Sequence, residues 1–219
     1  MDCSNGWACG GRWFGATVAI VGGGPSVDGM RPALDAARDS GCRTIAINDA
    51  YRIAPWADLL YFADRTWWDG RYGRAEDVRR TFGGQVATCS DADVDHHLVN
   101  TGIEGFDPRP GCVRTGQNSG YQAMHLALQM GARRIVLFGY DMSAAHGHHR
   151  GSRPEAVNAE MFHRLLQDGM LPLFRGLVPE IHRAGVEVLN ASPGSALRLW
   201  PVIGRDEAVR MFQACACGD

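Results

Sequence analysis

The feature that most constrains the fold of this chain is a series of short apolar runs, rich in β-branched residues, that each stop at a glycine or a polar residue. The five clearest runs cover residues 17–21, 44–47, 59–63, 134–138 and 186–189. Runs of this length without polar alternation are typical of strands buried on both faces, as in parallel sheets. The sequence therefore predicts a core of parallel strands.

Helical segments separate these runs. Predicted helices cover residues 31–40, 119–130, 155–168 and 171–184, and a further short strand is expected at 86–88. A strand, a helix and a second strand in this order form a right-handed crossover, which makes the two strands parallel. We predict an α/β fold, a single Rossmann-like domain with a mostly parallel sheet flanked by helices. Its expected divisions are an irregular lead-in over 1–16, the domain over 17–203 and a C-terminal helix or tail over 204–219.

The composition is that of an ordinary soluble globular protein. Of the 219 residues, 45% are apolar and 21% are charged, and the net charge is −2. This balance provides no general attraction to nucleic acid or to anionic membranes. The chain has no lysine, so all 22 basic residues are arginine. That excludes a phosphate-loop lysine, a Schiff base and a lysine general base.

The amino-terminal residues and the cysteines indicate a cellular location. The chain opens without a basic segment followed by an apolar one, and no apolar run approaches the length that a bilayer needs. Seven cysteines, an odd number scattered along the chain, disfavour a disulfide framework of the secreted type. We therefore expect a cytoplasmic protein without a membrane span, and a homo-oligomer is left open.

The residues that follow the predicted strands are the candidates for chemistry. The strands end at Gly22-Gly23-Gly24-Pro25-Ser26, Asn48-Asp49, Asp64, Tyr140-Asp141 and Asn190-Ala191-Ser192. Parallel strands bring such groups to one edge of the sheet, where open α/β sheets bind their ligands. We expect a single ligand cleft at that edge.

The glycine-rich turn after the first strand is the sharpest single motif. Its glycines allow close backbone approaches, and the helix that follows offers free amides to an anion such as phosphate. The stretch from Gly22 to Ser26 matches neither the dinucleotide fingerprint nor the phosphate-binding loop with its lysine. Neither a hydride-transfer enzyme nor a standard NTPase is therefore supported. The alternative is a tight turn without a ligand.

Other polar residues allow both a structural and a ligand-binding role. Asn118-Ser119-Gly120 begins the central helix, so its side chains cap that helix or bind a base, ribose or phosphate. Asp141 follows a strand and either caps the next turn or binds a sugar hydroxyl, a metal or a proton in transit. Asn48 and Asp49 allow the same two interpretations.

The segment His146-Gly147-His148-His149-Arg150 is where a general base is expected. Imidazole titrates near neutral pH, and a neighbouring arginine can stabilise a leaving phosphate. The histidine spacing matches no standard zinc pattern, and a solvated loop is the alternative. Trp67 and Trp68 either stack on a base or pack on the sheet.

Four motifs together resemble a known group of proteins. The motifs are Val21-Gly22-Gly23-Gly24-Pro25-Ser26, Ile47-Asn48-Asp49-Ala50-Tyr51, Asn118-Ser119-Gly120-Tyr121 and Leu137-Phe138-Gly139-Tyr140-Asp141-Met142. In this order they resemble a widespread family of uncharacterised phage and prophage proteins. That family is similar to the bacterial lipooligosaccharide sialyltransferases and to the superfamily of the hydroxymethylpterin pyrophosphokinases. The resemblance covers residues 17–201.

This resemblance implies a nucleotide site. In the sialyltransferases the glycine loop, the asparagine after the second strand and the Ser-Gly of the central helix hold the cytidine nucleotide, and a later histidine is the base. The matching residues here are Gly24, Pro25, Ser26, Asn48, Ser119 and Gly120, with His146, His148 or His149 as the base. Gly23 stands where the sialyltransferase loop has an asparagine, so the resemblance favours a nucleotide-using transferase over CMP-sialate as the particular donor.

We predict a glycosyltransferase-like enzyme with a nucleotide-activated sugar donor. Asp141 would orient the donor or the acceptor, a loop histidine would deprotonate the acceptor hydroxyl, and Arg150 or Arg153 would offset charge on the departing phosphate. The acceptor that the resemblance implies is a surface glycan or a modified base in phage DNA. In the phage case the protein acts in the cytoplasm of the bacterial host.

Two alternatives remain open. Transfer of diphosphate from ATP to a small alcohol would need Mg²⁺ held by carboxylates such as Asp49, Asp64 or Asp141. A non-catalytic nucleotide-binding protein would keep the cleft without the chemistry. The predicted catalytic residues are His146, His148, His149 and Asp141. The predicted nucleotide-binding residues are Gly22, Gly23, Gly24, Pro25, Ser26, Asn48, Asp49, Asn118, Ser119, Gly120 and Tyr140.

Overall fold

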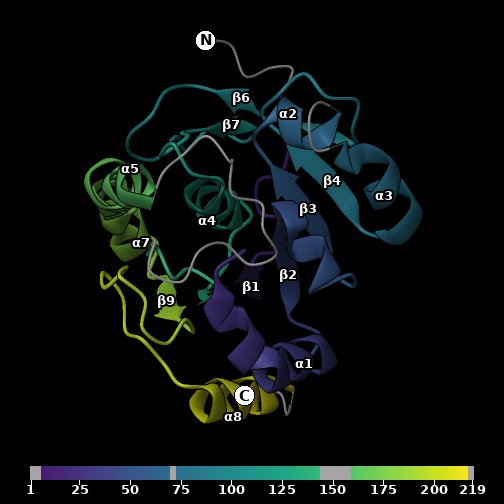
Figure 1. The fold of residues 1–219 in the computed structure, drawn as a ribbon. Coiled ribbons are helices and arrows are strands. Elements are labelled where there is room, and N and C mark those ends of the chain that lie inside the picture. The colour runs from purple at the N-terminus through teal and green to yellow at the C-terminus, as the bar shows by residue number, and fades with distance from the viewer. Residues whose placement is uncertain (1–5, 70–72, 144–158, 217–219) are drawn as a thin grey trace.

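The computed structural model describes residues 6–69, 73–143 and 159–216. At its centre is one seven-stranded sheet in the order β5-β4-β3-β2-β1-β8-β9 (Figure 1). Its strands are β1 (Thr17–Val21), β2 (Arg43–Ile47), β3 (Leu59–Phe62), β4 (Gln85–Thr88), β5 (His96–His97), β8 (Arg134–Phe138) and β9 (Glu187–Asn190). All neighbouring strands pair in parallel. The predicted α/β class with a parallel sheet is confirmed.

The strand bounds follow the apolar runs closely. β1 and β8 begin and end where the sequence predicts, β2, β3 and β4 differ by one residue at one end, and β9 is displaced by one residue at both ends. Two very short strands, β6 (Val99–Asn100) and β7 (Cys112–Val113), pair in parallel as a separate two-stranded sheet. Such two-residue strands carry no periodic signal of their own, and neither they nor β5 is predicted from the sequence.

The order of the strands places a topological switch point at the middle of the sheet. β1 pairs with β2 on one side and with β8 on the other, so that Ile20 lies opposite both Ile45 and Leu137. The chain first runs outward from β1 through β2, β3 and β4, and then returns to add β8 and β9 on the other side of β1. The chain therefore leaves β1 and β8 towards opposite sides of the sheet, and open α/β sheets bind their ligands at such a switch point.

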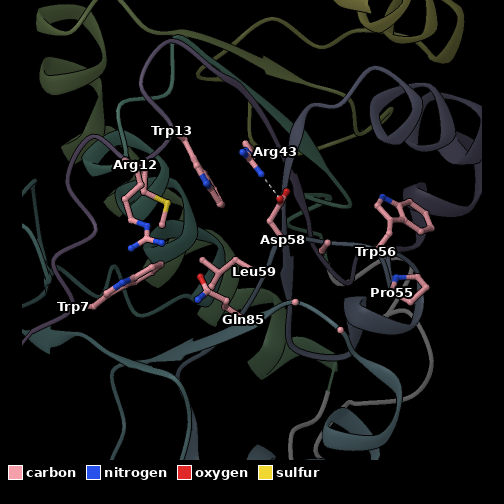
Figure 2. A pocket seen from close by; sticks show the side chains of 13 residues that line it. Trp7, Arg12, Trp13, Arg43, Pro55, Trp56, Asp58, Leu59 and Gln85 are labelled. Atoms are coloured by element: carbon pink, nitrogen blue, oxygen red, sulfur yellow. Dashed lines mark hydrogen bonds and ion pairs between the residues drawn. The ribbon is translucent and has the colours of Figure 1, made fainter.

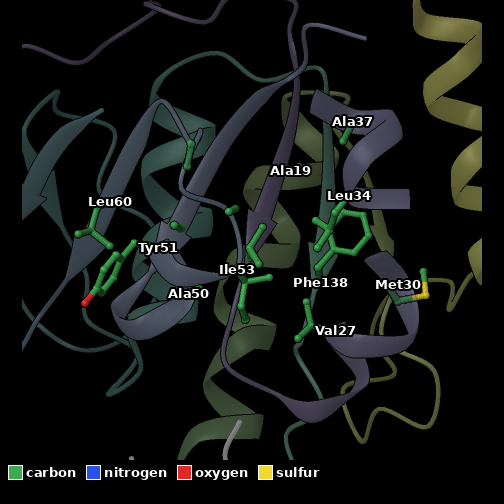
Figure 3. Packing of buried hydrophobic residues seen from close by; sticks show 14 of the residues in the cluster. Ala19, Val27, Met30, Leu34, Ala37, Ala50, Tyr51, Ile53, Leu60 and Phe138 are labelled. Carbon is green, nitrogen blue, oxygen red and sulfur yellow. The ribbon is translucent and has the colours of Figure 1, made fainter. Parts of the chain in front are cut away.

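One face of the sheet is covered by the amino-terminal and carboxy-terminal helices. Its cluster includes Ala19 and Val21 of β1 and Phe138 of β8, packed on Leu34 and Met30 (Figure 3). The covering elements are the 3₁₀ helices η1 (Pro25–Met30) and η2 (Asn48–Arg52) and the helices α1 (Arg31–Asp39), α2 (Arg65–Trp68), α3 (Arg74–Thr81) and α8 (Arg205–Ala216). The C-terminal helix predicted within 204–219 is thus part of the core packing.

The opposite face is covered mainly by α4 (Ser119–Gln129), which was predicted as a central helix. Its cluster joins Val18 and Ile20 of β1 to Met124 and Ala127 of α4 and to Phe174. Because successive residues of a strand point to opposite faces, β1 contributes to both clusters. Burial on both faces is the reason that its run is continuously apolar.

The segment after residue 159 is broken where the sequence predicts two longer helices. It consists of α5 (Ala159–Arg164), the π-helix η4 (Leu165–Met170), α6 (Leu171–Leu173), the 3₁₀ helix η5 (Phe174–Leu177) and α7 (Val178–Arg183). Gly169, Pro172, Gly176 and Pro179 lie along it. Glycine and proline weaken or interrupt the α-helical hydrogen-bond ladder, which accounts for the changes of helix type.

Two further observations concern membrane spans and the cysteines. Within the residues that the structure describes, no helix combines the length and the apolar character needed to cross a membrane. Cys112 is disulfide-bonded, whereas Cys9, Cys42, Cys89 and Cys215 are free.

Candidate nucleotide site

A hollow of about 420 Å³ lies at the carboxyl edge of the sheet and is lined by the segments that follow β1, β2, β3 and β8 and by the start of α4. We call it the carboxyl-edge hollow. Its volume is within the range of ligand pockets, and its place at the switch point is where open α/β sheets bind ligands. Ten of the predicted site residues line it, namely Gly22, Gly23, Gly24, Asn48, Asp49, Asn118, Ser119, Gly120, Tyr140 and Asp141.

The other predicted site residues fall into two groups. Pro25 and Ser26 follow the glycine loop but are not among the lining residues. His146, His148 and His149, together with Arg150 and Arg153, lie outside the described residues. The roles predicted for these histidines and arginines therefore stay predictions.

Asp141 ties the glycine loop to the end of β8. Its two carboxylate oxygens accept hydrogen bonds from the amide of Ser26 at 3.1 Å and from the Ser26 hydroxyl at 2.7 Å. Asp141 is only 6% exposed. Each carboxylate oxygen thus already has one partner. The two bonds position the loop after β1.

The glycines of this loop are required by close backbone approach. A Cβ atom on Gly24 would overlap the Asp141 carboxylate and the carbonyl oxygen of Gly139. A Cβ atom on Gly139 would lie 2.7 Å from the carbonyl oxygen of Gly22, and Gly139 also has a φ of +67°. The two loops can therefore touch only because neither carries a side chain at these points.

Most amides of the glycine loop are already bonded. Gly22 donates to Phe138 O at 2.7 Å, and Gly24 donates to Gly139 O at 2.9 Å. Proline has no N–H group, and the Ser26 amide donates to Asp141. Within the described residues, the amide of Gly23 is the loop amide that has no partner. The loop therefore offers one free donor rather than the phosphate cradle that its three glycines suggest.

The start of α4 supplies a second set of donors. Asn118 caps the helix, since its Oδ1 accepts from the amides of Gly120 at 2.7 Å and Tyr121 at 3.2 Å. Asn118 thus caps α4, which is the structural role that the sequence allowed for it. Ser119 lines the hollow, and in the described part of the chain neither its amide nor its hydroxyl has a hydrogen-bond partner. These two groups lie at the N-terminus of α4, where anions are favoured.

Tyr140 and Gly120 connect the loop after β8 to the start of α4. The Tyr140 hydroxyl donates to Gly120 O at 3.0 Å, and a Cβ atom on Gly120 would lie 2.9 Å from the Tyr140 ring. Burial raises the pKa of Tyr140 well above its ordinary value, so the hydroxyl keeps its proton. This contact holds the end of β8 against the start of α4.

Three non-glycine residues with left-handed backbones gather at this hollow. Asn48 has a φ of +50°, Gln117 of +51° and Met142 of +48°, and all three are among the lining residues. Within the described chain, no other non-glycine residue has a positive φ. Such conformations cost about 1–3 kcal/mol each and cluster at functional sites. Sequence reasoning missed Gln117 and Met142, because neither residue type favours this conformation.

The charged residues of the hollow are acidic. Asp49 is paired with Arg74 at 2.8 Å, Asp141 is bonded to Ser26, and Asp64 is exposed at the rim. No arginine or histidine is among the described lining residues. No three metal-ligating side chains of the described chain come together as a metal site.

The remaining wall is apolar and comes from elements far apart in the chain. Trp67 of α2 lies on one side, and Leu165, Leu166 and Met170 of the π-helix η4 lie on the other. π-Helical turns occur often at functional sites. Trp68 does not line the hollow and stacks on Phe62 at 5.0 Å. The sequence analysis did not select Leu165, Leu166 and Met170, because apolar residues on a half-apolar helix normally indicate packing against the core.

Comparisons with known proteins find a similar fold in solved structures of two glycosyltransferases. No protein-family model matches the chain, and no curated protein sequence does. Among solved structures, the chain is similar to the MAf glycosyltransferase of Magnetospirillum magneticum AMB-1, with a TM-score of 0.55 and 14% identity over 93% of this chain. It spans 37% of the length of that protein.

A second solved structure is similar over nearly the full length of both chains. It is the sialyltransferase CstII of Campylobacter jejuni, in complex with the substrate analogue cytidine-5′-monophosphate. The TM-score is 0.52 and the identity 12%, with 87% of this chain and 85% of that one covered. At such identities the likeness establishes a shared α/β fold, and function has to be argued from the site itself.

Proposed function

We propose that the protein is a glycosyltransferase-like enzyme that binds a nucleotide-activated sugar in the carboxyl-edge hollow. The observation that carries this proposal is the convergence of unpartnered donors at one switch point. The Gly23 amide, the Asn48 side chain and the Ser119 amide and hydroxyl come from three separate loops and line the same space. Phosphate and ribose oxygens are suitable acceptors for them.

The apolar wall supports a nucleotide rather than a bare phosphate. Trp67, Leu166 and Met170 offer surface to a base or to a sugar ring, whereas an inorganic anion makes no use of it. The similarity to a sialyltransferase fold that is known with cytidine-5′-monophosphate supports the same ligand class. It does so by analogy of fold alone.

The proposed reaction moves the sugar from the nucleotide phosphate to an acceptor hydroxyl. The acceptor oxygen forms the new bond to the sugar carbon while the bond from that carbon to the phosphate oxygen breaks. A base takes the hydroxyl proton, and His146, His148 and His149 are the candidates. Asp141 acts as a positioning residue, because its bonds to Ser26 hold the glycine loop.

The test of binding is calorimetric titration with CMP, UDP, GDP and ATP, each with and without Mg²⁺. We expect at least one pyrimidine or purine nucleotide to bind without metal. Ser119→Ala should weaken binding about tenfold, as loss of a hydrogen bond to a charged oxygen does. Ser40→Ala, at the end of α1 and outside the hollow, is the matched control and should bind like the wild type. Binding of ATP alone, and only with Mg²⁺, would instead support diphosphate transfer.

The test of catalysis is hydrolysis of the nucleotide sugar whose nucleotide binds best. The wild type should release the nucleotide faster than a variant with His146, His148 and His149 all changed to alanine. Equal background rates in the two proteins, with nucleotide binding intact in both, would leave a non-catalytic nucleotide-binding protein.

A further inference from the structure

A second hollow, of about 540 Å³, lies at the opposite edge of the sheet, where the strands begin. Arg43, Leu59 and Gln85, the first residues of β2, β3 and β4, line it. Figure 2 shows them between Trp7 and Arg12 on one side and Pro55 and Trp56 on the other. We call this the amino-edge hollow, and its main polar and aromatic side chains are Trp7, Arg12, Trp13, Arg43, Asp58 and Gln85.

The segment before β1 builds one wall of this hollow and is held firmly. The Trp7 amide donates to His97 O at 2.8 Å, and the Trp13 amide donates to Met130 O at 2.8 Å. The Trp7 ring stacks on His96 with centroids 3.9 Å apart and planes 4° from parallel. The aromatic wall is therefore formed before any ligand arrives, which lowers the entropic cost of binding.

Arg12 presents an unused cation to the amino-edge hollow. Its guanidinium lies 5.5 Å from the centre of the Trp7 ring, and Figure 2 shows the two side chains next to each other. In the described parts of the chain this guanidinium has neither a carboxylate partner nor a hydrogen bond, and the residue is exposed. A guanidinium supported on an aromatic face keeps its edge free for a bidentate contact with a carboxylate.

The floor of the amino-edge hollow combines donors and acceptors. Arg43 donates to Asp58 at 2.6 Å, and the Thr44 amide donates to the other oxygen of Asp58 at 2.8 Å. The Arg43 side chain is 50% exposed and that of Asp58 is 31% exposed, so both have capacity for further bonds. Gln85 is exposed beside them and adds an amide that can both donate and accept.

We propose that the amino-edge hollow is a binding site for an acidic saccharide, separate from the carboxyl-edge hollow. Arg12 would receive the sugar carboxylate. Asp58, Gln85 and Arg43 would bond ring hydroxyls, which need acceptors as well as donors. Trp13 would contact the apolar face of the ring, whereas Trp7, whose faces are occupied by His96 and Arg12, supports the Arg12 guanidinium. The site is non-catalytic, and its existence rests on this hollow rather than on the proposed function.

The chemistry of this hollow argues against the two nearest alternatives. A nucleic-acid strand would bring phosphates towards the Asp58 carboxylate, and the chain as a whole carries a net charge of −2. A simple inorganic anion would use the arginines and would leave the aromatic wall and Gln85 without a role. An acidic sugar uses all of these groups together.

The experiment follows the six tryptophan indole N–H signals by NMR during titration with N-acetylneuraminic acid. We expect the signals of Trp7 and Trp13 to move and that of Trp67, in the carboxyl-edge hollow, to stay. Arg12→Gln should weaken binding about tenfold. Arg133→Gln, which changes another exposed arginine outside this hollow, should leave binding unchanged. The methyl ester of the sugar should also bind about tenfold more weakly, because its carboxylate charge is gone.

Several outcomes overturn the proposal. If sodium acetate and sodium phosphate move the same signals to the same extent, the site holds an adventitious ion only. Movement of Trp67 alone, no movement of any indole signal, or unchanged affinity in Arg12→Gln would each reject it. The nucleotide that binds best in the calorimetric titration, added to the same samples, should move Trp67 and not Trp7, so failure of the nucleotide site is seen separately.

Discussion

At the scale of single residues, the carboxyl-edge hollow is marked by backbone conformations that the local sequence does not favour. Asn48, Gln117 and Met142 adopt left-handed backbones, and the contacts around them hold them there. The Asn118 amide donates to Thr115 O at 3.0 Å, and Gln167 donates to Met142 O at 3.0 Å. The first bond closes a local turn around Gln117, and the second joins Met142 to η4, so strained backbone at the pocket is held in place by its surroundings.

Asn48 allows the backbone and side-chain contributions to be separated. Asn48→Ala should lower the free energy of unfolding by about 1 kcal/mol, because alanine resists the left-handed region. Asn48→Gly should leave stability nearly unchanged, since glycine adopts a positive φ freely. Both variants lose the amide and should bind nucleotide equally weakly. Urea unfolding and CMP titration check this, and wild-type affinity in Asn48→Gly would remove Asn48 from the nucleotide site.

At the scale of elements, α8 completes one face of the sheet although it comes last in the chain. Phe212 of α8 is fully buried and stacks on Phe138 of β8 with ring centroids 6.1 Å apart. α8 also packs beside α1 (Figure 1). The C-terminal helix thus covers the strand whose end forms the carboxyl-edge hollow.

Removal of the Phe212 ring should therefore be costly. We expect Phe212→Ala to lower the free energy of unfolding by about 3–5 kcal/mol, the usual cost of a large aromatic cavity. Gln213→Ala changes the exposed neighbour on the same helix and should stay within about 0.5 kcal/mol of the wild type. Urea unfolding monitored by circular dichroism measures both. A loss below about 1 kcal/mol in Phe212→Ala would show that α8 is not part of the cooperative core.

At the scale of the whole molecule, a buried polar cluster joins the connection between β6 and β7 to the central helix α4. His125 of α4 is fully buried, and its Nε2 accepts a hydrogen bond from the Asp107 amide at 2.9 Å. Gln129 of α4 donates to the carbonyl oxygens of Asp107, Arg109 and Cys112 at 2.7–2.8 Å. These contacts fasten residues 107–112 over α4.

This cluster predicts acid sensitivity. Burial lowers the pKa of His125 to about 4, below its ordinary value of 6.5, so the unfolded chain binds more protons between these two values. The contribution of His125 to the free energy of unfolding is therefore fully present above pH 6.5 and is lost as the pH falls towards 4. From about pH 7 to about pH 4.5, the expected loss is about 2 kcal/mol.

His125→Gln is the variant that isolates this effect. Its amide oxygen can accept the Asp107 bond but does not titrate, so the difference in pH slope between the two proteins reports His125 alone. The Arg109 hydrogen bond holds the pKa of Asp107 well below its usual range, so the Asp107 contribution is lost only at lower pH. Urea unfolding at the two pH values measures the slopes, and equal slopes in wild type and variant would contradict the prediction.

The sequence alone determined the elements and the chemistry at their ends. Residues 17–21 and 134–138 read as buried strands because burial on both faces demands unbroken apolar side chains, and this demand is local. The polar and glycine residues after those strands could be assigned to one edge because parallel strands share a direction. Ten of the predicted site residues line the carboxyl-edge hollow for that reason.

Tertiary structure alone decided which groups are free to act. The order of the strands depends on pairing between distant segments, so the switch point between β1 and β8 has no local signal. The amides of Gly22 and Gly24 donate to carbonyl oxygens at the end of β8, and the Asp141 carboxylate accepts from Ser26. Among the described residues, the amide and hydroxyl of Ser119 have no partner. The amino-edge hollow likewise exists because the lead-in is bonded across the end of α4. Local sequence specifies which groups a chain carries, and long-range packing specifies which of them remain unsatisfied and therefore available to a ligand.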